Sequence, residues 1–199
     1  LLVARSDPSA LDGLARIGRL LSDPALVDKS LRSTTRHAPQ DWRTWQNLGA
    51  FMMEQSNFAE AIEHLQTAAG LAPDNEAAPL NGLAQAYLAR EEAPAALVHA
   101  ERAVRMSGSG VSLYLRGRAH FDLERYNEAE HDFKKAVLAD ASLVEARGGI
   151  GQIRAMRGDY QSAAEQFKSV LQLDPDNAAA RENLRLLTPL LPDEPRQGP

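Results

Sequence analysis

The histidines, the acidic side chains and two glycine-rich stretches are the residues of this 199-residue chain whose types could support chemistry. Gly148-Gly149-Ile150-Gly151 is similar to a phosphate-cradling loop, but such a loop follows a strand, and no strand is indicated before it. Ser107-Gly108-Ser109-Gly110 is not paired with a base and is typical of a turn. His120-Phe121-Asp122 and His131-Asp132 could supply metal ligands, yet no third ligand recurs one helical turn away, so we expect solvated side chains. We therefore predict no enzyme, no metal site and no cofactor.

His64 and His99 lie 35 residues apart, which predicts equivalent surface positions in two copies of a repeated unit rather than a metal pair. Alanines follow the same period, with intervals of 35, 33 and 34 residues, and an apolar residue stands four residues after each of them. Those alanines are Ala61, Ala96, Ala129 and Ala163, and the later residues are Leu65, Ala100, Phe133 and Phe167. Apolar residues at this spacing form a stripe along a helix, and only stacking of repeated units covers such stripes.

The start of each unit also repeats. Trp45, Leu80, Leu113 and Arg147 open the units, and Gly49, Ala84, Gly117 and Gly151 follow four residues later. Small residues at these places predict a close crossing of two helices. Trp45-Gln46-Asn47-Leu48-Gly49, the spaced alanines and the Pro73 and Pro175 breaks together resemble the tetratricopeptide repeat, a helix-turn-helix of about 34 residues. The resemblance covers residues 42 to 177 and implies an all-α fold, a right-handed α-solenoid of stacked units.

The period divides the whole chain. Val27 and Leu31 stand one period before Ala61 and Leu65, and Asp23-Pro24 is a good helix start, so a degenerate unit is expected near the N-terminus. After Asn177 one further amphipathic helix should cap the array. The expected segments are an N-terminal tail (1–7), a degenerate unit (8–41), four units (42–75, 77–109, 110–143 and 144–177), a capping helix (178–188) and a disordered tail (189–199). We expect them to form a single structural domain.

Composition narrows the function classes. The formal net charge of −5 argues against nucleic acid as a main partner, because phosphate binding needs a clustered basic face. Without cysteine there is no thiol chemistry, and no apolar run reaches the length of a membrane-spanning helix. The start at Leu1-Leu2-Val3 suggests a piece of a longer protein, and the alanine-rich and arginine-rich usage suggests a bacterial source. The compartment stays open between cytoplasm, periplasm and a membrane tether lying outside the fragment.

The resemblance places a ligand face on the concave side, along the outward positions of the first helices. The residues implied as partner-binding are Arg43, Gln46, Asn47, Met53, Asn81, Gln85, Tyr114, Arg118, Phe121 and Gln152. The same outward face also includes Ala50, Glu54, Ala78, Leu88, Val111, Asp122, Glu145, Gly148 and Met156. Amides can pair with a peptide backbone, and the apolar members can accept its side chains. We expect a non-catalytic scaffold or adaptor that binds a protein or peptide segment and no small-molecule substrate. The alternatives are an accessory domain that positions substrates in a larger enzyme or envelope assembly, and a self-assembling homo-oligomer.

Overall fold

The structure is a computed structural model that describes residues 8–191, and throughout that part of the chain the regular elements are helices. The all-α prediction is therefore confirmed for the described residues. The α-helices are α1 (Pro8–Leu20), α2 (Pro24–His37), α3 (Trp42–Glu54), α4 (Phe58–Leu71), α5 (Ala78–Ala89), α6 (Ala93–Met106), α7 (Gly110–Asp122), α8 (Tyr126–Ala139), α9 (Val144–Met156), α10 (Tyr160–Leu173) and α11 (Ala178–Leu187). A 3-10 turn, η2 (Thr188–Leu190), follows α11.

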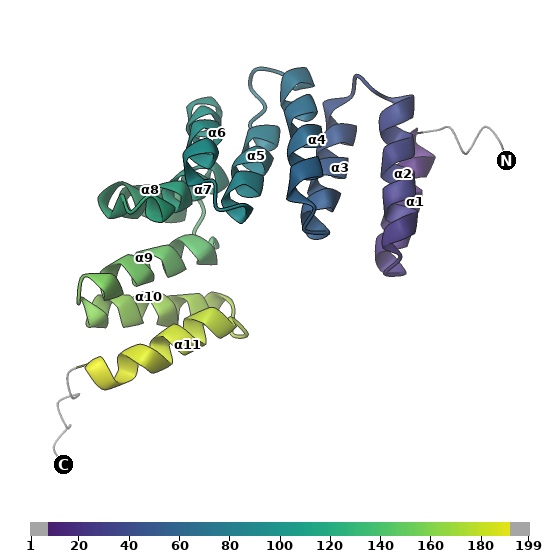
Figure 1. Ribbon diagram of the computed structural model, residues 1–199. Helices are drawn as coiled ribbons and strands as arrows, with labels where there is room; N and C mark the ends of the chain where they lie inside the picture. The colour runs from purple at the N-terminus through teal and green to yellow at the C-terminus, as the bar shows by residue number, and fades with distance from the viewer. Residues whose placement is uncertain (1–7, 192–199) are drawn as a thin grey trace, which may run out of the picture. The chain divides into compact units, whose positions relative to one another are not determined.

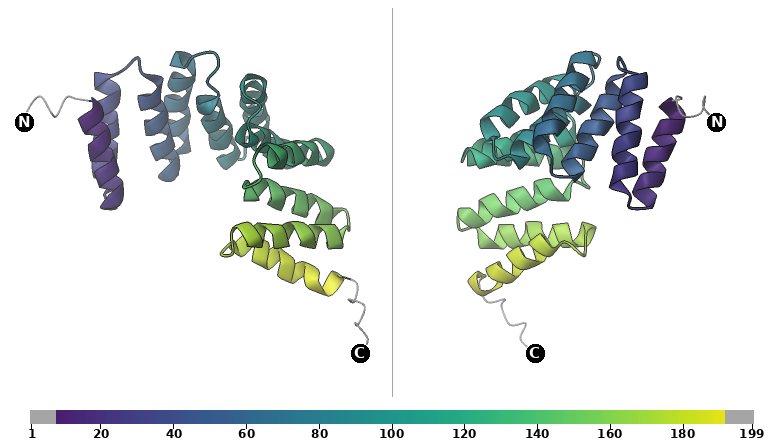
Figure 2. Two further views of the ribbon diagram at one scale, coloured as in Figure 1. Left: turned by 180° about the vertical axis from the view of Figure 1, so that it is seen from behind. Right: turned by 45° about the vertical axis from the view of Figure 1, so that its right-hand side comes forward.

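The chain divides into two compact units, unit 1 (Leu1–Ser107) and unit 2 (Gly108–Pro199), where one domain had been expected. Unit 1 stacks the antiparallel pairs α1–α2, α3–α4 and α5–α6, and unit 2 stacks α7–α8 and α9–α10 with α11 packed on α10 (Figures 1 and 2). The division falls in the Ser107–Gly110 turn, where Gly108 adopts a φ of 56°. A glycine there gives the backbone a conformation that other residues rarely adopt.

Short polar side chains start several of these helices. Asp23, Asp159 and Asn177 each accept a hydrogen bond from the backbone N–H three residues later, at 3.0, 3.2 and 2.9 Å. These bonds satisfy amide groups that have no partner within the helix. The expected start at Asp23-Pro24 is confirmed. At the Pro73 break, by contrast, Ala77 is the cap residue of α5 and makes no side-chain cap bond.

Each turn within a helix pair contains one residue with a positive φ. The residues are Ser22, Ser56, Glu91, Glu124 and Gly158, with φ values of 53°, 57°, 61°, 59° and 81°. Four of the five are not glycine, although the left-handed conformation costs other residues roughly 1–2 kcal/mol. Stacking of the two helices therefore imposes a turn that the local sequence does not favour.

Small residues allow the paired helices to cross closely, as their spacing predicts. A Cβ atom at Gly117 would lie 2.8 Å from Cδ1 of Phe133, and one at Gly151 would lie 2.9 Å from Cε1 of Phe167. The second-helix alanines at these crossings, Ala129 and Ala163, are fully buried. A larger residue at either position would have to displace the opposing helix.

The surface prediction for His64 and His99 is wrong. The ring centroids of His64 and Trp45 are 5.7 Å apart. The His99 ring stacks on the Tyr87 ring, with the ring centroids 5.4 Å apart and an angle of 3° between the ring planes. Both histidines are partly buried between the two helices of their pair. Their shared spacing thus reflects a shared packing position, because each second helix presents this side chain to its own first helix.

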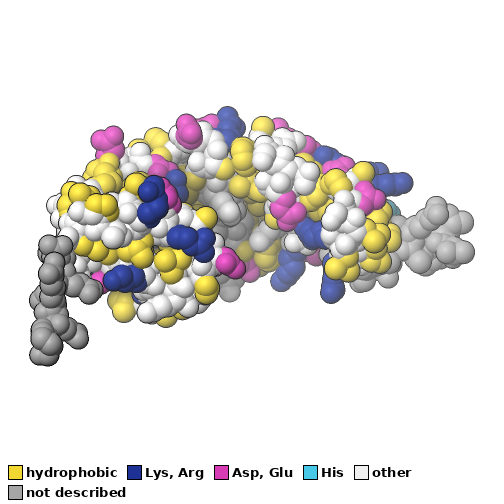
Figure 3. Space-filling model, turned by 90° about the horizontal axis from the view of Figure 1, so that it is seen from below, with side chains coloured by type: hydrophobic (Ala, Val, Ile, Leu, Met, Phe, Trp, Pro, Cys, Tyr) yellow, Lys and Arg dark blue, Asp and Glu magenta, His cyan; other side chains and the backbone are white. Residues whose placement is uncertain are grey.

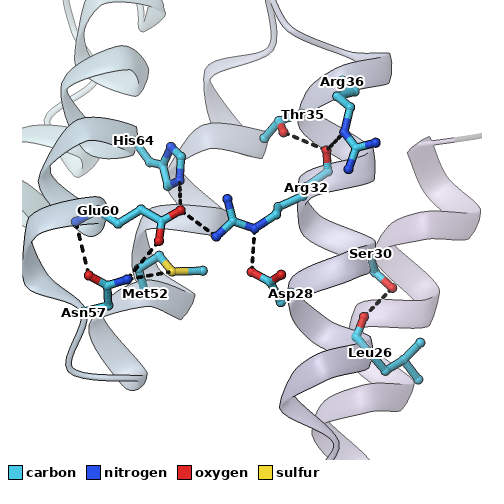
Figure 4. A network of polar contacts seen from close by, with 10 residues as sticks. All are labelled: Leu26, Asp28, Ser30, Arg32, Thr35, Arg36, Met52, Asn57, Glu60 and His64. Carbon is cyan, nitrogen blue, oxygen red and sulfur yellow. Dashed lines mark hydrogen bonds and ion pairs between the residues drawn. The ribbon is translucent and has the colours of Figure 1, made fainter.

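Arginine 32 ties the first helix pair to the second. Its Nη2 donates to Glu60 Oε1 at 2.5 Å and its Nε donates to Asp28 Oδ1 at 2.8 Å (Figure 4). The hydrogen bond from Arg32 is the main cause that lowers the pKa of Glu60. The helix pair that the degenerate N-terminal pattern predicted therefore packs through α2 on α3, as α4 packs on α5 and α8 packs on α9.

The structure tests the predictions for the two terminal segments only in part. Residues 1–7 and 192–199 lie outside the described residues, whereas Pro189 and Leu190, which had been assigned to a disordered tail, belong to η2. In the part of the chain that the structure describes, none of the helices has the length and apolar character needed to cross a membrane.

Candidate functional site

Unit 2 contains a cavity of about 320 Å³ on the side of its first helices. Three kinds of element line it: α7 and α9, the capping helix α11, and the second helices α8 and α10 with the turn after α10. The lining residues are Tyr114, Arg118, Phe121, Phe133, Val144, Glu145, Gly148, Gly149, Gln152, Phe167, Val170, Asp174, Asn177, Ala179, Ala180 and Asn183. The helical stacking of one unit thus creates a recess with an apolar base and a polar rim.

Aromatic side chains form the α7 side of this cavity. Tyr114 and Phe121 are partly buried on α7, and the Tyr114 ring lies 5.9 Å from the fully buried ring of Phe133. Burial raises the pKa of the Tyr114 hydroxyl, which therefore stays protonated and can donate a hydrogen bond at neutral pH. This wall offers a large apolar side chain both ring contacts and one polar anchor.

Arg118 stands beside Tyr114 but is already engaged. Its Nε donates to Asp122 Oδ1 at 3.0 Å, four residues further along α7. Burial disfavours the charged guanidinium, but the hydrogen bond and the negative charge of Asp122, together with Tyr114, outweigh it and keep the pKa of Arg118 above its usual value. Because Asp122 balances this cation, Arg118 does not make the cavity basic.

The rest of the rim is acidic and amide-rich. Glu145 and Gln152 are exposed on α9, and Asn183 stands on α11. In the turn before α11, Asn177 donates from Nδ2 to Asp174 Oδ2 at 3.0 Å, while its Oδ1 caps the helix. A ligand would therefore meet carboxylates at Glu145 and Asp174 and amides that can pair with a peptide backbone.

Two adjacent glycines on α9 have different roles. A Cβ atom at Gly149 would lie closer than 3 Å to three atoms of the Phe133 ring, whereas one at Gly148 would find nothing within 4 Å. Gly149 therefore permits the contact between α8 and α9, and Gly148 leaves the base of the cavity open. The glycine-rich sequence serves helix packing and groove depth, since it lies within α9 and not in a loop.

The structure brings together four of the ten predicted binding residues, namely Tyr114, Arg118, Phe121 and Gln152, and the additional Glu145 and Gly148 join them. The other six lie in unit 1. Arg43, Gln46, Asn47 and Met53 are on α3, and Asn81 and Gln85 are on α5, which contacts α3. Met53 packs against the apolar core of unit 1, and Arg43 lies over the Trp42 ring at 4.7 Å.

Sequence reasoning missed the base and the third wall of the cavity. Phe133 and Phe167 were predicted only as packing positions, and the sequence analysis did not predict Val170, Asp174, Asn177 or Asn183 as site residues. The repeat period did contain a signal for this wall. In the repeat, α11 occupies the position of a first helix, so its residues that face the groove belong to the same face as those of α7 and α9. The capping helix therefore both covers the core and contributes to the site.

The histidine and carboxylate candidates form a different, polar recess of unit 2. Arg116, His120, Asn127, Glu128, His131 and Asp132 line it. Arg116 binds Asp132 through two hydrogen bonds of 2.6 Å, and Nδ1 of His120 is buried without a hydrogen bond. In the described part of the chain, no group of three or more histidine, aspartate or glutamate side chains is arranged to hold a metal ion.

Stacked helix pairs of a constant period, with a recess along the first helices, define a helical-repeat protein of the α-solenoid class. Models of the tetratricopeptide repeat match residues 43–109 and 114–178, so the chain belongs to the tetratricopeptide repeat family, as its sequence pattern had predicted. Members of this family are typically non-catalytic interaction modules.

Relatives and solved structures agree with this family. The chain is 34% identical over 89 residues to the pea (Pisum sativum) protein named translocon at the outer membrane of chloroplasts 64; the match covers 43% of this chain and 15% of that protein. The repeat protein TTC0263 of Thermus thermophilus is 17% identical with a TM-score of 0.76, over 92% of this chain and 99% of that one. YrrB, described as a repeat protein with an unusual peptide-binding site, is 14% identical with a TM-score of 0.64, over 90% of this chain and 93% of that one. At these identities the two structures show a shared fold.

Proposed function

We propose that this protein is an interaction scaffold whose unit 2 cavity holds a peptide segment of a partner protein. The observation that carries the proposal is the cavity itself, a recess of about 320 Å³ with aromatic walls, an amide rim and an open base at Gly148. Proteins of this family bind protein or peptide partners, and the solved neighbour YrrB is described as having a peptide-binding site.

The lining suggests the chemistry of the segment. Phe133 and Phe167 at the base favour one large apolar side chain, because burial of such a group stabilises the complex by about 1.5–3 kcal/mol. Glu145 and Asp174 favour a lysine or arginine beside it, since Arg118 is balanced by Asp122. Gln152 and Asn183 are placed to pair with the peptide backbone. The proposed ligand is therefore a short segment with an aromatic or aliphatic residue next to a cation.

A selection of random peptides on the intact chain tests this proposal. Peptides displayed on phage are enriched, synthesised and measured by calorimetry against the native chain and against Gly148→Leu. The leucine should fill the open base of the cavity and weaken binding at least about tenfold, because 1.4 kcal/mol of lost contact already has that effect. Tyr114→Ala should weaken binding in the same direction.

The matched control is Gly70→Leu, which also adds a leucine to a helical glycine whose Cβ would meet nothing within 4 Å, but on α4. It should bind the selected peptides as the native chain does. Glu145→Lys should reduce the affinity for peptides that contain a cation and spare those that do not. Selected peptides that bind Gly148→Leu and Tyr114→Ala as tightly as the native chain would rule out this cavity as the site.

A further inference from the structure

An apolar row on α1 lies in the position of buried core residues of later repeats. Leu14 and Ile17 are 38% and 47% exposed, whereas Leu48 and Phe51, one period later on α3, are 1% and 3% exposed. On α9 the matching Ile150 and Ile153 are 4% and 1% exposed. The first helix of the array thus carries the same core-forming row as the others, but the row is uncovered.

The later repeats show what kind of element covers such a row. Leu48 and Phe51 belong to one apolar cluster with Val27 and Leu31 of α2, the second helix of the preceding pair. In unit 2, α9 packs in the same way on α8, where Gly149 meets Phe133. The covering element is in each case an amphipathic helix. No described helix takes that place on α1.

The uncovered face is hollow and bordered by cations. A recess of about 360 Å³ there is lined by Leu11, Leu14, Leu26, Lys29, Ser30, Ser33 and Arg36. Lys29 and Arg36 are exposed, and neither forms an ion pair with a described residue. At the α1 and α2 end of unit 1, Figure 3 shows apolar side chains with both basic and acidic side chains around them. Among the side chains that the structure describes, those lining the recess include no acidic one.

We propose that this face docks an amphipathic helix of a partner protein whose apolar stripe is flanked by acidic residues. The apolar stripe of the partner helix would pack against the leucines of the recess and Ile17. Lys29 and Arg36 would form ion pairs with the acidic residues beside that stripe. A contiguous row of exposed apolar side chains on a protein surface marks an interaction site, which supports a bound helix at this face.

The charges disfavour a second copy of this chain as the occupant. Two copies joined through this face would bring Lys29 and Arg36 of both together. At the opposite end of the array, exposed Leu186 and Leu190 offer an apolar surface, but Arg181 and Arg185 add further cations there. Glu182 is already bound to Arg185 at 2.7 Å. Within the described residues, neither surface of a second copy supplies free acidic groups.

The test uses the intact 199-residue chain and a fluorescent, helix-stapled 18-residue peptide with leucines at positions i, i+3, i+4 and i+7, flanked by glutamates. A second peptide has lysine at each glutamate position. We expect the glutamate peptide to bind about tenfold more tightly than the lysine peptide, because two ion pairs at an exposed site contribute on that scale. Lys29→Glu with Arg36→Glu should reverse the preference.

Leu14→Gln with Ile17→Gln should weaken binding of the glutamate peptide at least tenfold, and the thermal unfolding midpoint should confirm that both variants fold. Leu138→Gln, which alters an 86% exposed leucine on α8, is the matched control and should bind normally. Gly148→Leu should also bind normally, which separates this face from the cavity of the proposed function. The proposal would be overturned if the two peptides bound with equal affinity. It would also be overturned if Leu14→Gln with Ile17→Gln did not weaken binding of the glutamate peptide.

Two further outcomes would assign the face to another occupant and overturn the proposal as well. One is sedimentation of the native chain as a dimer that Leu14→Gln with Ile17→Gln dissociates, because a second copy would then cover the row. The other is peptide binding that requires removal of residues 1–7, because a segment of this chain would then occupy it.

Discussion

Arg116 and Asp132 form a two-pronged ion pair between α7 and α8, with Nε and Nη2 each 2.6 Å from a carboxylate oxygen. The Asp132 side chain is 3% exposed and that of Arg116 is 23% exposed. Arg116 stands at the repeat position that Leu48, Leu83 and Ile150 fill elsewhere. A charged pair thus replaces an apolar contact at one position of an otherwise apolar row.

Removal of one partner of this pair should destabilise unit 2 strongly. We expect Asp132→Ala or Arg116→Leu alone to lower the free energy of unfolding by about 3–5 kcal/mol, because each change removes both hydrogen bonds of this largely buried pair and leaves the remaining charge without them. Urea denaturation followed by circular dichroism measures the change.

The double variant Arg116→Leu with Asp132→Gln restores the residue types found at these positions in other repeats, Leu83 and Gln166. Its stability should return to that of the native chain or exceed it, since apolar replacement of a buried ion pair is often neutral or favourable. A double variant less stable than both single variants would contradict this interpretation.

Relief of the backbone at Glu124 should stabilise the turn between α7 and α8. With a φ of 59°, Glu124 adopts a conformation that glycine adopts without steric cost, so Glu124→Gly should raise the free energy of unfolding by about 0.5–1 kcal/mol. The reverse change, Gly158→Glu at the equivalent turn, should lower it. Thermal unfolding of the two variants tests both signs, and a loss in Glu124→Gly would show that its side chain matters more than its backbone.

Adjacent glycines of α9 should respond oppositely to alanine. Gly148→Ala should stabilise the helix by about 0.5–1 kcal/mol, because its methyl group has room and the unfolded chain loses freedom. Gly149→Ala should cost about 1–3 kcal/mol through overlap with the Phe133 ring. Chemical denaturation of this pair measures both effects; equal effects would mean that α8 and α9 adapt readily.

Histidine burial should make the fold less stable in acid. Burial, with Arg102 adding to it, lowers the pKa of His99, and burial also lowers that of His120, although Asp132 opposes the shift. The unfolded chain therefore takes up these protons first as the pH falls. The free energy of unfolding should decrease as the pH drops below the unfolded pKa of about 6.5 and level off below the folded values.

His99→Gln should reduce that pH dependence, because it removes one of the two histidines whose pKa burial lowers. Denaturation midpoints between pH 7.5 and 5 give the slopes. A steeper loss of stability in His99→Gln would contradict the sign derived from burial.

The repeat period was enough to predict the helix pairs and the small residues at their crossings. Gly117 and Ala129 could be placed from sequence because a fixed period brings identical neighbours to identical positions, and side-chain size at a crossing depends on those neighbours alone. The repeat register, together with the geometry that the family resemblance implies, also predicted one shared face for Tyr114, Arg118, Phe121 and Gln152.

Features that depend on contacts between particular side chains were not available from the sequence. The left-handed turns at Ser22, Ser56, Glu91 and Glu124 have no local signal, because packing of the flanking helices imposes them. His64 and His99 were assigned to the surface, since periodicity gives a position in the repeat but not the aromatic ring beside it.

By itself, the sequence determined the helical repeat and which helix faces are apolar, because these follow from spacing along one chain. Tertiary structure alone decided that the capping helix α11 forms a wall of the cavity, that Arg116 meets Asp132, and that Leu14 and Ile17 are uncovered. These depend on which elements lie side by side in space, and identical apolar positions become core or surface according to the presence of a neighbouring helix.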